Sequence, residues 1–104
     1  MILTGIAKEK FLEWNENREG KTLTLKELEL MSESVILNAL IIEFFDEYGI
    51  HINIFYKYTW RVEIRDSQSS LLSTLNYAVF DTRQEATIQA IKKANDIYNE
   101  RNEL

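Results

Sequence analysis

The stretch FDTRQEATIQAIKKANDIYN, residues 80–99, decides the fold, because it joins a strand-like segment to the clearest amphipathic helix in the chain. Thr82 and Glu85 have the spacing of a capping box, in which both side chains accept hydrogen bonds from free backbone N–H groups at a helix start. Apolar residues then recur on one helix face, and these are Ala86, Ala90, Ile91, Ala94, Ile97 and Tyr98. The pattern predicts a helix that begins at Thr82, ends near Asn99 and packs closely on a sheet.

Strand patterns precede this helix. Residues 50–57 alternate apolar and polar side chains, as a strand with one buried face requires, and residues 60–65 repeat the alternation. The serine-rich stretch 66–73 is typical of a loop. Residues 75–80 are predicted to form a third strand, antiparallel to the second.

Two helical patterns open the chain. Residues 5–18 are predicted to form a helix that Thr4 caps and Gly20 ends, with a stripe of Leu3, Ala7, Phe11 and Trp14. A second capping box, Thr24 and Glu27, predicts another helix start. That helix either continues to Tyr48 or breaks at residues 31–34, where serines compete for backbone hydrogen bonds.

The predicted order is helix, helix, three strands, helix, in one domain spanning residues 1–104. It indicates an α+β fold with a three-stranded antiparallel meander (ααβββα). If the second and third helices share one face of the sheet and the first covers the other, the result is an α/β/α sandwich.

Composition narrows the function. The 104 residues include no cysteine, which excludes disulfides, thiolate metal sites and a cysteine nucleophile. A net charge of −5 disfavours nucleic acid and anionic lipid as partners. No apolar run reaches the ~20 residues that cross a bilayer, and the N-terminus lacks a signal-peptide core. We therefore expect a cytoplasmic protein that does not associate with membranes.

Candidate chemical sites are sparse. His51 is the single histidine, and no Gly-x-Ser-x-Gly motif is present, so a solvated strand residue is the favoured interpretation of His51. Glu43, Asp46 and Glu47 could hold a hard cation together with His51, but a solvated acidic stripe explains them as well. Glycine-rich phosphate loops are absent. We expect no enzyme activity, no cofactor and no metal.

The stretch 35–48 is apolar on nearly all sides, apart from Asn38 and a narrow acidic stripe. A helix of this kind either lies between layers or offers a face to a partner, which is another protein or a second copy of the chain. The candidate interaction surface comprises Ile36, Leu37, Ile41, Phe44 and Phe45.

An alternative surface lies on the polar face of the first two strands. Aromatic and cationic side chains on an open sheet can stack bases and contact phosphates, and here they are Asn53, Phe55, Lys57, Arg61 and Arg65. The element order is similar to that of double-stranded-RNA-binding domains. Gln84 and Thr87, however, stand where that family has lysines.

Three blocks together resemble small phage and prophage proteins of gut anaerobes: residues 44–52, residues 80–86 and residues 90–99. The resemblance covers about the last 60 residues. It implies a mobile-element origin and a small αβ domain, and it assigns no functional residue. The sequence thus predicts a non-enzymatic, phage- or prophage-derived protein-interaction module, with nucleic-acid association as the alternative.

Overall fold

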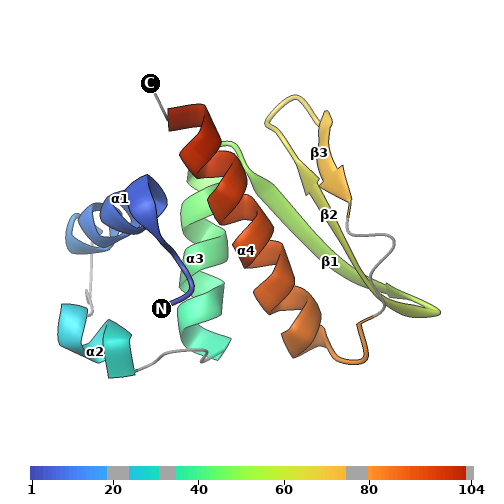
Figure 1. The fold of residues 1–104 in the computed structure, drawn as a ribbon, viewed down its shortest axis with the longest axis horizontal. Coiled ribbons are helices and arrows are strands. Elements are labelled where there is room, and N and C mark those ends of the chain that lie inside the picture. Colours follow the sequence, from blue (N-terminus) through green and yellow to red (C-terminus); the bar gives the residue numbers. More distant parts are fainter. Residues whose placement is uncertain (19–23, 31–34, 75–79, 103–104) are drawn as a thin grey trace.

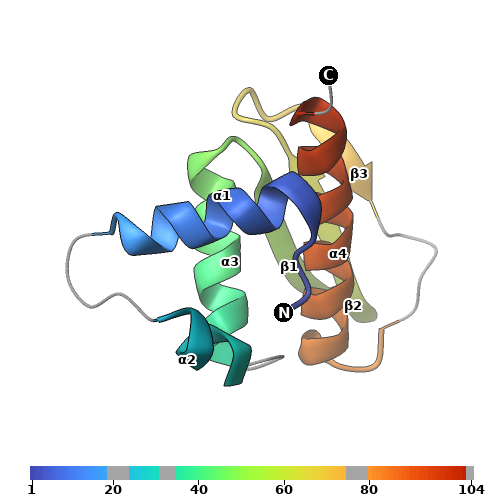
Figure 2. The same cartoon turned by 60° about the vertical axis from the view of Figure 1, so that its left-hand side comes forward.

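The computed structural model describes residues 1–18, 24–30, 35–74 and 80–102 (Figure 1). Its elements follow the predicted α+β order, with the helical region before the sheet in three described segments. They are α1 (Gly5–Glu16), α2 (Leu25–Leu30), α3 (Val35–Glu47), β1 (His51–Lys57), β2 (Thr59–Arg65), β3 (Leu71–Thr74) and α4 (Arg83–Asn102). α2 lies beside the lower end of α3 and not on its axis (Figure 2), so α2 and α3 do not form one straight helix.

The sheet is the predicted antiparallel meander, in the order β1-β2-β3. Ile52 pairs with Ile64 and Ile54 with Val62, so their side chains share the face that the helices cover. β3 starts earlier than predicted, inside the segment 66–73 that we interpreted as a loop. Within the predicted strand, residues 75–79 lie outside the described residues, and Phe80 forms an isolated bridge with Trp60.

The molecule has three layers, and they differ from the α/β/α sandwich. α3 and α4 run side by side in the same direction and pack against the sheet (Figure 2). α1 crosses the outer side of these two helices and contacts both. The order is therefore sheet, helix pair, helix. The first helix extends the helical core, and it does not cover the second face of the sheet.

Local hydrogen bonds explain where the helices begin. The hydroxyls of Thr24 and Thr82 accept hydrogen bonds from the backbone N–H groups of Glu27 and Glu85, each at 3.1 Å, which confirms both predicted capping positions. Thr4 is the N-cap residue of α1, as predicted, but its side chain makes no capping hydrogen bond. Instead, Oδ1 of Asn99, on α4, accepts a hydrogen bond from the N–H of Ala7 at 2.8 Å.

One contiguous core joins the layers. The predicted stripes of α1 and α4 contribute Phe11, Ala90 and Ala94, all fully buried, and the sheet contributes Val62 and Ile64. The alanines leave α4 without bulk on its inner face, so its backbone approaches the sheet closely. α4 continues to Asn102 and is therefore slightly longer than predicted.

Candidate functional site

The predicted interaction surface on α3 is wrong in four of its five residues. Leu37, Ile41, Phe44 and Phe45 are at most 1% exposed and belong to the core, so they cannot meet a partner. Only Ile36, at 63%, reaches the surface. The other interpretation of this apolar helix holds, because α3 lies between layers.

Aromatic packing accounts for the apolar C-terminal half of α3. The Phe44 ring lies 5.6 Å from that of Phe11, 5.2 Å from Phe45 and 5.7 Å from Tyr98, measured between ring centroids. Tilted and edge-on aromatic pairs at such distances are favourable. The apolar side chains in this half of the helix are therefore packed against other parts of the same chain.

The N-terminal end of α3 differs, because apolar side chains stay on the surface there. Val35 is 73% exposed and Ile36 63%, and Leu30 of the neighbouring α2 is 79% exposed. Single exposed apolar residues are ordinary, but three in this short part of the chain point to a contact surface.

A groove lies next to these residues, between α3, β1 and the start of α4, with a volume of about 460 Å³. Such a volume is within the usual range for ligand sites. We call it the Asn38 groove, and its lining residues are Val35, Asn38, Ala39, Ile42, Ile54, Arg83, Gln84 and Thr87. Its walls are aliphatic, and its polar groups come from Asn38 and the first turns of α4.

Asn38 is the unusual residue of the groove. It is 2% exposed, and neither its amide oxygen nor its amide nitrogen has a hydrogen-bond partner among the residues that the structure describes. A buried polar group without a partner costs about 1–3 kcal/mol. The sequence contained a signal for this residue, because Asn38 interrupts an otherwise apolar run, but the interruption by itself does not indicate a site.

The groove is electrostatically suited to an anion. α3 and α4 both begin at this end of the molecule (Figure 2), so the positive ends of two helix dipoles lie close to it. No acidic side chain occupies the first turn of α3, whereas α4 has Glu85 there. The guanidinium of Arg83 is held 4.8 Å above the Trp60 ring, which is a cation–π geometry.

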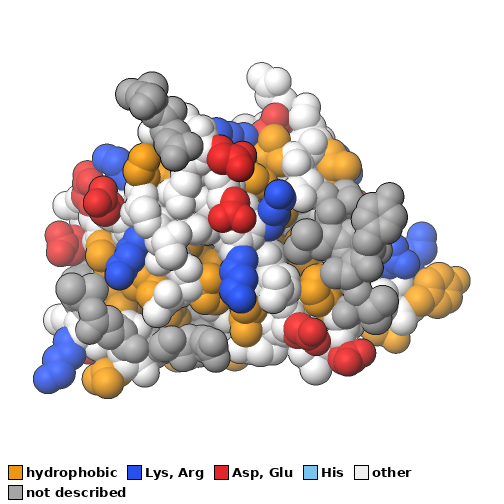
Figure 3. Space-filling model, viewed as in Figure 1, with side chains coloured by type: hydrophobic (Ala, Val, Ile, Leu, Met, Phe, Trp, Pro, Cys, Tyr) orange, Lys and Arg blue, Asp and Glu red, His pale blue; other side chains and the backbone are white. Residues whose placement is uncertain are grey.

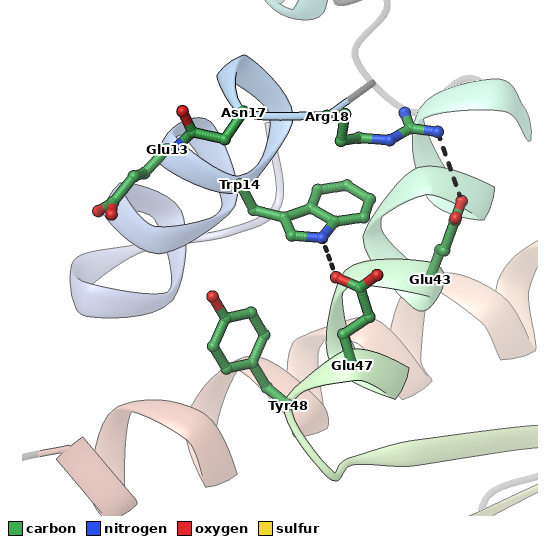
Figure 4. A pocket seen from close by; sticks show the side chains of 7 residues that line it. All are labelled: Glu13, Trp14, Asn17, Arg18, Glu43, Glu47 and Tyr48. Carbon is green, nitrogen blue, oxygen red and sulfur yellow. Dashed lines mark hydrogen bonds and ion pairs between the residues drawn. The ribbon is translucent and has the colours of Figure 1, made fainter. Parts of the chain in front are cut away.

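The opposite end of α3 carries a second hollow, of about 440 Å³, between the ends of α1 and α3 (Figure 4). Its polar groups are paired with one another. The Trp14 indole N–H donates to the Glu47 carboxylate, and Arg18 lies 3.8 Å from Glu43 and 4.9 Å from the Trp14 ring centroid. These contacts connect α1 to α3, so we interpret them as structural.

The acidic stripe does not form a cation site. Glu43 is paired with Arg18, Glu47 accepts from Trp14, and Asp46 lies 2.6 Å from Nδ1 of His51. Within the described part of the chain, no group of three or more acidic, histidine or cysteine side chains could hold a metal ion.

Residues of the alternative nucleic-acid face lie together on the sheet, but part of their positive charge is paired within the protein. Phe55 pairs with Arg61 across the hairpin, on the side away from α3 and α4. Arg65 lies 3.5 Å from Glu63 and also donates to the Ser69 carbonyl, so this cation is engaged within the protein. On the face of the molecule that Figure 3 shows, acidic and basic side chains are interspersed. This distribution of charge does not favour phosphate binding.

Fold and site together define a small α+β domain with an apolar groove, and a buried amide that lines the groove has no partner in the described part of the chain. Comparison with protein-family models, curated proteins and solved structures gives no significant match. Among the described residues, no helix is long and apolar enough to cross a membrane.

Proposed function

We propose that this chain is a protein-interaction module of phage or prophage origin, and that it binds an extended peptide segment of a partner protein in the Asn38 groove. The observation that carries the proposal is the amide of Asn38, which lines the groove, is buried, and has no hydrogen-bond partner among the residues that the structure describes. A group that costs stability when it is unpaired is explained if a ligand pairs with it.

The chemistry of the amide indicates the kind of ligand. A carboxamide offers one acceptor and two donors, and a peptide group supplies the matching N–H and C=O. Apolar side chains of the ligand would lie against Ile42 and Ile54. The two helix starts and Arg83 favour a carboxylate nearby. The expected ligand is an extended segment with an aliphatic side chain next to an acidic residue.

Exposed apolar residues outside the groove support a macromolecular ligand. Leu30 and Ile36 are exposed and do not line the groove, so a small molecule bound there would leave them uncovered. A peptide that continues past the groove would cover them. The partner's backbone would thus be recognised in the groove and its neighbouring side chains on α2 and α3.

The test is selection of a displayed random-peptide library on the immobilised full chain. Enriched peptides should share an aliphatic residue beside Asp or Glu, and their binding is then measured by fluorescence anisotropy. Asn38→Leu should weaken binding at least about tenfold, a change of about 1.4 kcal/mol. N-methylation of one peptide bond should have a similar effect, because it removes the N–H.

Lys10→Ala is the matched control, because Lys10 is an exposed residue of α1 outside the groove. Enriched peptides that bind Asn38→Leu as tightly as the wild type would overturn the proposal. Light scattering after size exclusion tests whether a second copy of the chain binds this surface instead of a peptide. A dimer that Ile36→Glu dissociates would place a second copy on this surface, and the peptide proposal would be wrong.

A further inference from the structure

A separate cluster lies at the far end of α3 from the groove, where three segments meet. Asp46 stands in the last turn of α3, His51 is the first residue of β1, and Ser67 belongs to the β2–β3 connection. Oδ1 of Asp46 lies 2.6 Å from Nδ1 of His51, and Oγ of Ser67 lies 3.5 Å from Nε2. A carboxylate, an imidazole and a hydroxyl thus form one chain of neighbouring polar groups.

The alignment assigns a role to each nitrogen of the ring. A carboxylate accepts only, so Nδ1 of His51 carries the proton and donates it to Asp46. Nε2 then presents its lone pair to the Ser67 hydroxyl. An oriented base beside a hydroxyl is the arrangement that activates a serine nucleophile, and its distances are commonly longer before substrate binds.

The backbone holds Asp46 and His51 in place. The N–H of Ile50 donates to the carbonyl of Phe45 at 2.9 Å, and the N–H of Gly49 donates to the backbone carbonyl of Asp46 at 3.2 Å. Gly49 has φ +78°, which closes α3 and turns the chain directly into β1. A Cβ at this position would lie 3.0 Å from Oγ of Ser67, so a larger residue would require the serine hydroxyl to move.

The loop is equally well anchored on the Ser67 side. Oδ1 of Asp66 accepts hydrogen bonds from the N–H groups of Gln68 and Ser70, both at 2.9 Å. The Asp66 N–H donates to the Ser70 carbonyl at 2.9 Å, which closes the turn around Ser67. The nucleophile candidate therefore sits in a defined turn.

A hollow of about 360 Å³ lies beside the serine. Tyr48, Gln68 and Arg101 contribute to its lining, and Arg101 comes from the last turn of α4. The hollow gives room for an ester. Ser67 and Arg101 both line it, so a reacting hydroxyl and a guanidinium, which pairs well with carboxylates, belong to the same hollow.

We propose that Asp46, His51 and Ser67 hydrolyse small carboxylate-bearing esters. Oγ of Ser67 attacks the ester carbonyl carbon while its proton passes to Nε2 of His51. The bond to the leaving oxygen then breaks, and that oxygen takes the proton from the imidazolium. A water molecule then attacks the carbonyl carbon of the acyl-serine while its proton passes to Nε2 of His51. The bond to Oγ breaks, Oγ takes the proton back from the imidazolium, and the acid is released. Asp46 positions the ring, and Arg101 holds the substrate carboxylate.

The experiment compares 4-acetoxy-3-nitrobenzoate with 2-nitrophenyl acetate, two chromogenic acetyl esters that differ only in the carboxylate. The full chain should hydrolyse the first with the higher kcat/KM, and Arg101→Gln should raise KM for that ester alone. Ser67→Ala and His51→Gln should each lower kcat/KM about 100-fold, the lower end of what general base catalysis contributes. Asp46→Asn should lower kcat and leave KM unchanged.

Ser70→Ala is the matched control, since it alters a serine of the same loop whose contacts given above are made by its backbone. It should keep wild-type activity, with circular dichroism confirming the fold of every variant. A fluorophosphonate should label the wild type once, at Ser67, as mapped by tandem mass spectrometry. Absence of hydrolysis, labelling elsewhere, or loss in His51→Gln with Ser67→Ala unaffected would each overturn the proposal.

Discussion

The side chains at the two ends of α3 differ in how far they are packed or paired within the protein. At the C-terminal end, aromatic rings pack on one another and each acidic side chain has a partner, such as Trp14 for Glu47 and His51 for Asp46. At the N-terminal end, Val35 and Ile36 are exposed and the Asn38 amide is unpaired among the described residues. The side chains in the C-terminal half of α3 thus stabilise the fold. Those exposed or unpaired in its N-terminal half are not explained by a contribution to stability.

The largest expected change in the free energy of unfolding distinguishes the two halves of α3. Phe44→Ala should lower the free energy of unfolding by about 3–5 kcal/mol, because it leaves a cavity inside a ring cluster. Ile36→Ala should change the free energy of unfolding by no more than about 0.5 kcal/mol. Urea denaturation followed by circular dichroism measures both. Similar losses in the two variants would show that the N-terminal end also belongs to the core.

A smaller effect of opposite sign is expected at Asn38. Asn38→Leu should raise the free energy of unfolding by about 1–3 kcal/mol, because it removes two unpaired polar atoms and adds apolar contact next to Ile42 and Ile54. Urea denaturation of the free protein measures the change. Ala39→Leu, at a neighbouring position of the groove, controls for added apolar bulk. A destabilised Asn38→Leu variant would mean that the amide has a structural role.

The fold followed from the sequence wherever its cause was local. The capping hydroxyls of Thr24 and Thr82 are three residues from the N–H groups that they accept from, so spacing alone predicts them. Asn99 caps α1 from the other end of the chain, and its polar position in α4 carries no sign of that contact. Local pattern therefore predicted the elements, whereas the position of α1 depended on distant contacts.

The candidate sites were harder to predict for the same reason. The apolar run from Val35 onward showed that α3 would be covered on most sides, but which residues stayed exposed depended on how α1, α4 and the sheet divide its surface. Asn38 was visible only as an interruption of that run. Ser67 is one of several serines in a polar loop, and the pairing of β1 with β2, which sets His51 opposite Arg65, brings it to His51.

The smallest expected effect concerns Tyr98, which packs against the C-terminal half of α3. Burial raises the pKa of its phenol above the ordinary value of 10.0, with further contributions from Tyr48 and from the Glu13 carboxylate. Well below pH 10 the phenol is neutral in both the folded and the unfolded chain, so its ionisation does not change the free energy of unfolding. As the pH approaches and passes 10, the unfolded chain loses the proton first, so the free energy of unfolding falls as the pH rises toward the folded pKa.

Tyr98→Phe removes this titration and should flatten the decline between pH 9.5 and 11, as measured by urea denaturation at each pH. The comparison is made between the two proteins at equal pH, because they differ only at position 98. Tyr58→Phe is the control, since Tyr58 is 89% exposed and its phenol is surrounded by water in either state. If both substitutions flatten the curve equally, burial beside α3 is not the cause. A curve that only Tyr98→Phe flattens would show that the C-terminal half of α3 excludes water from the ring, as a half that stabilises the fold must.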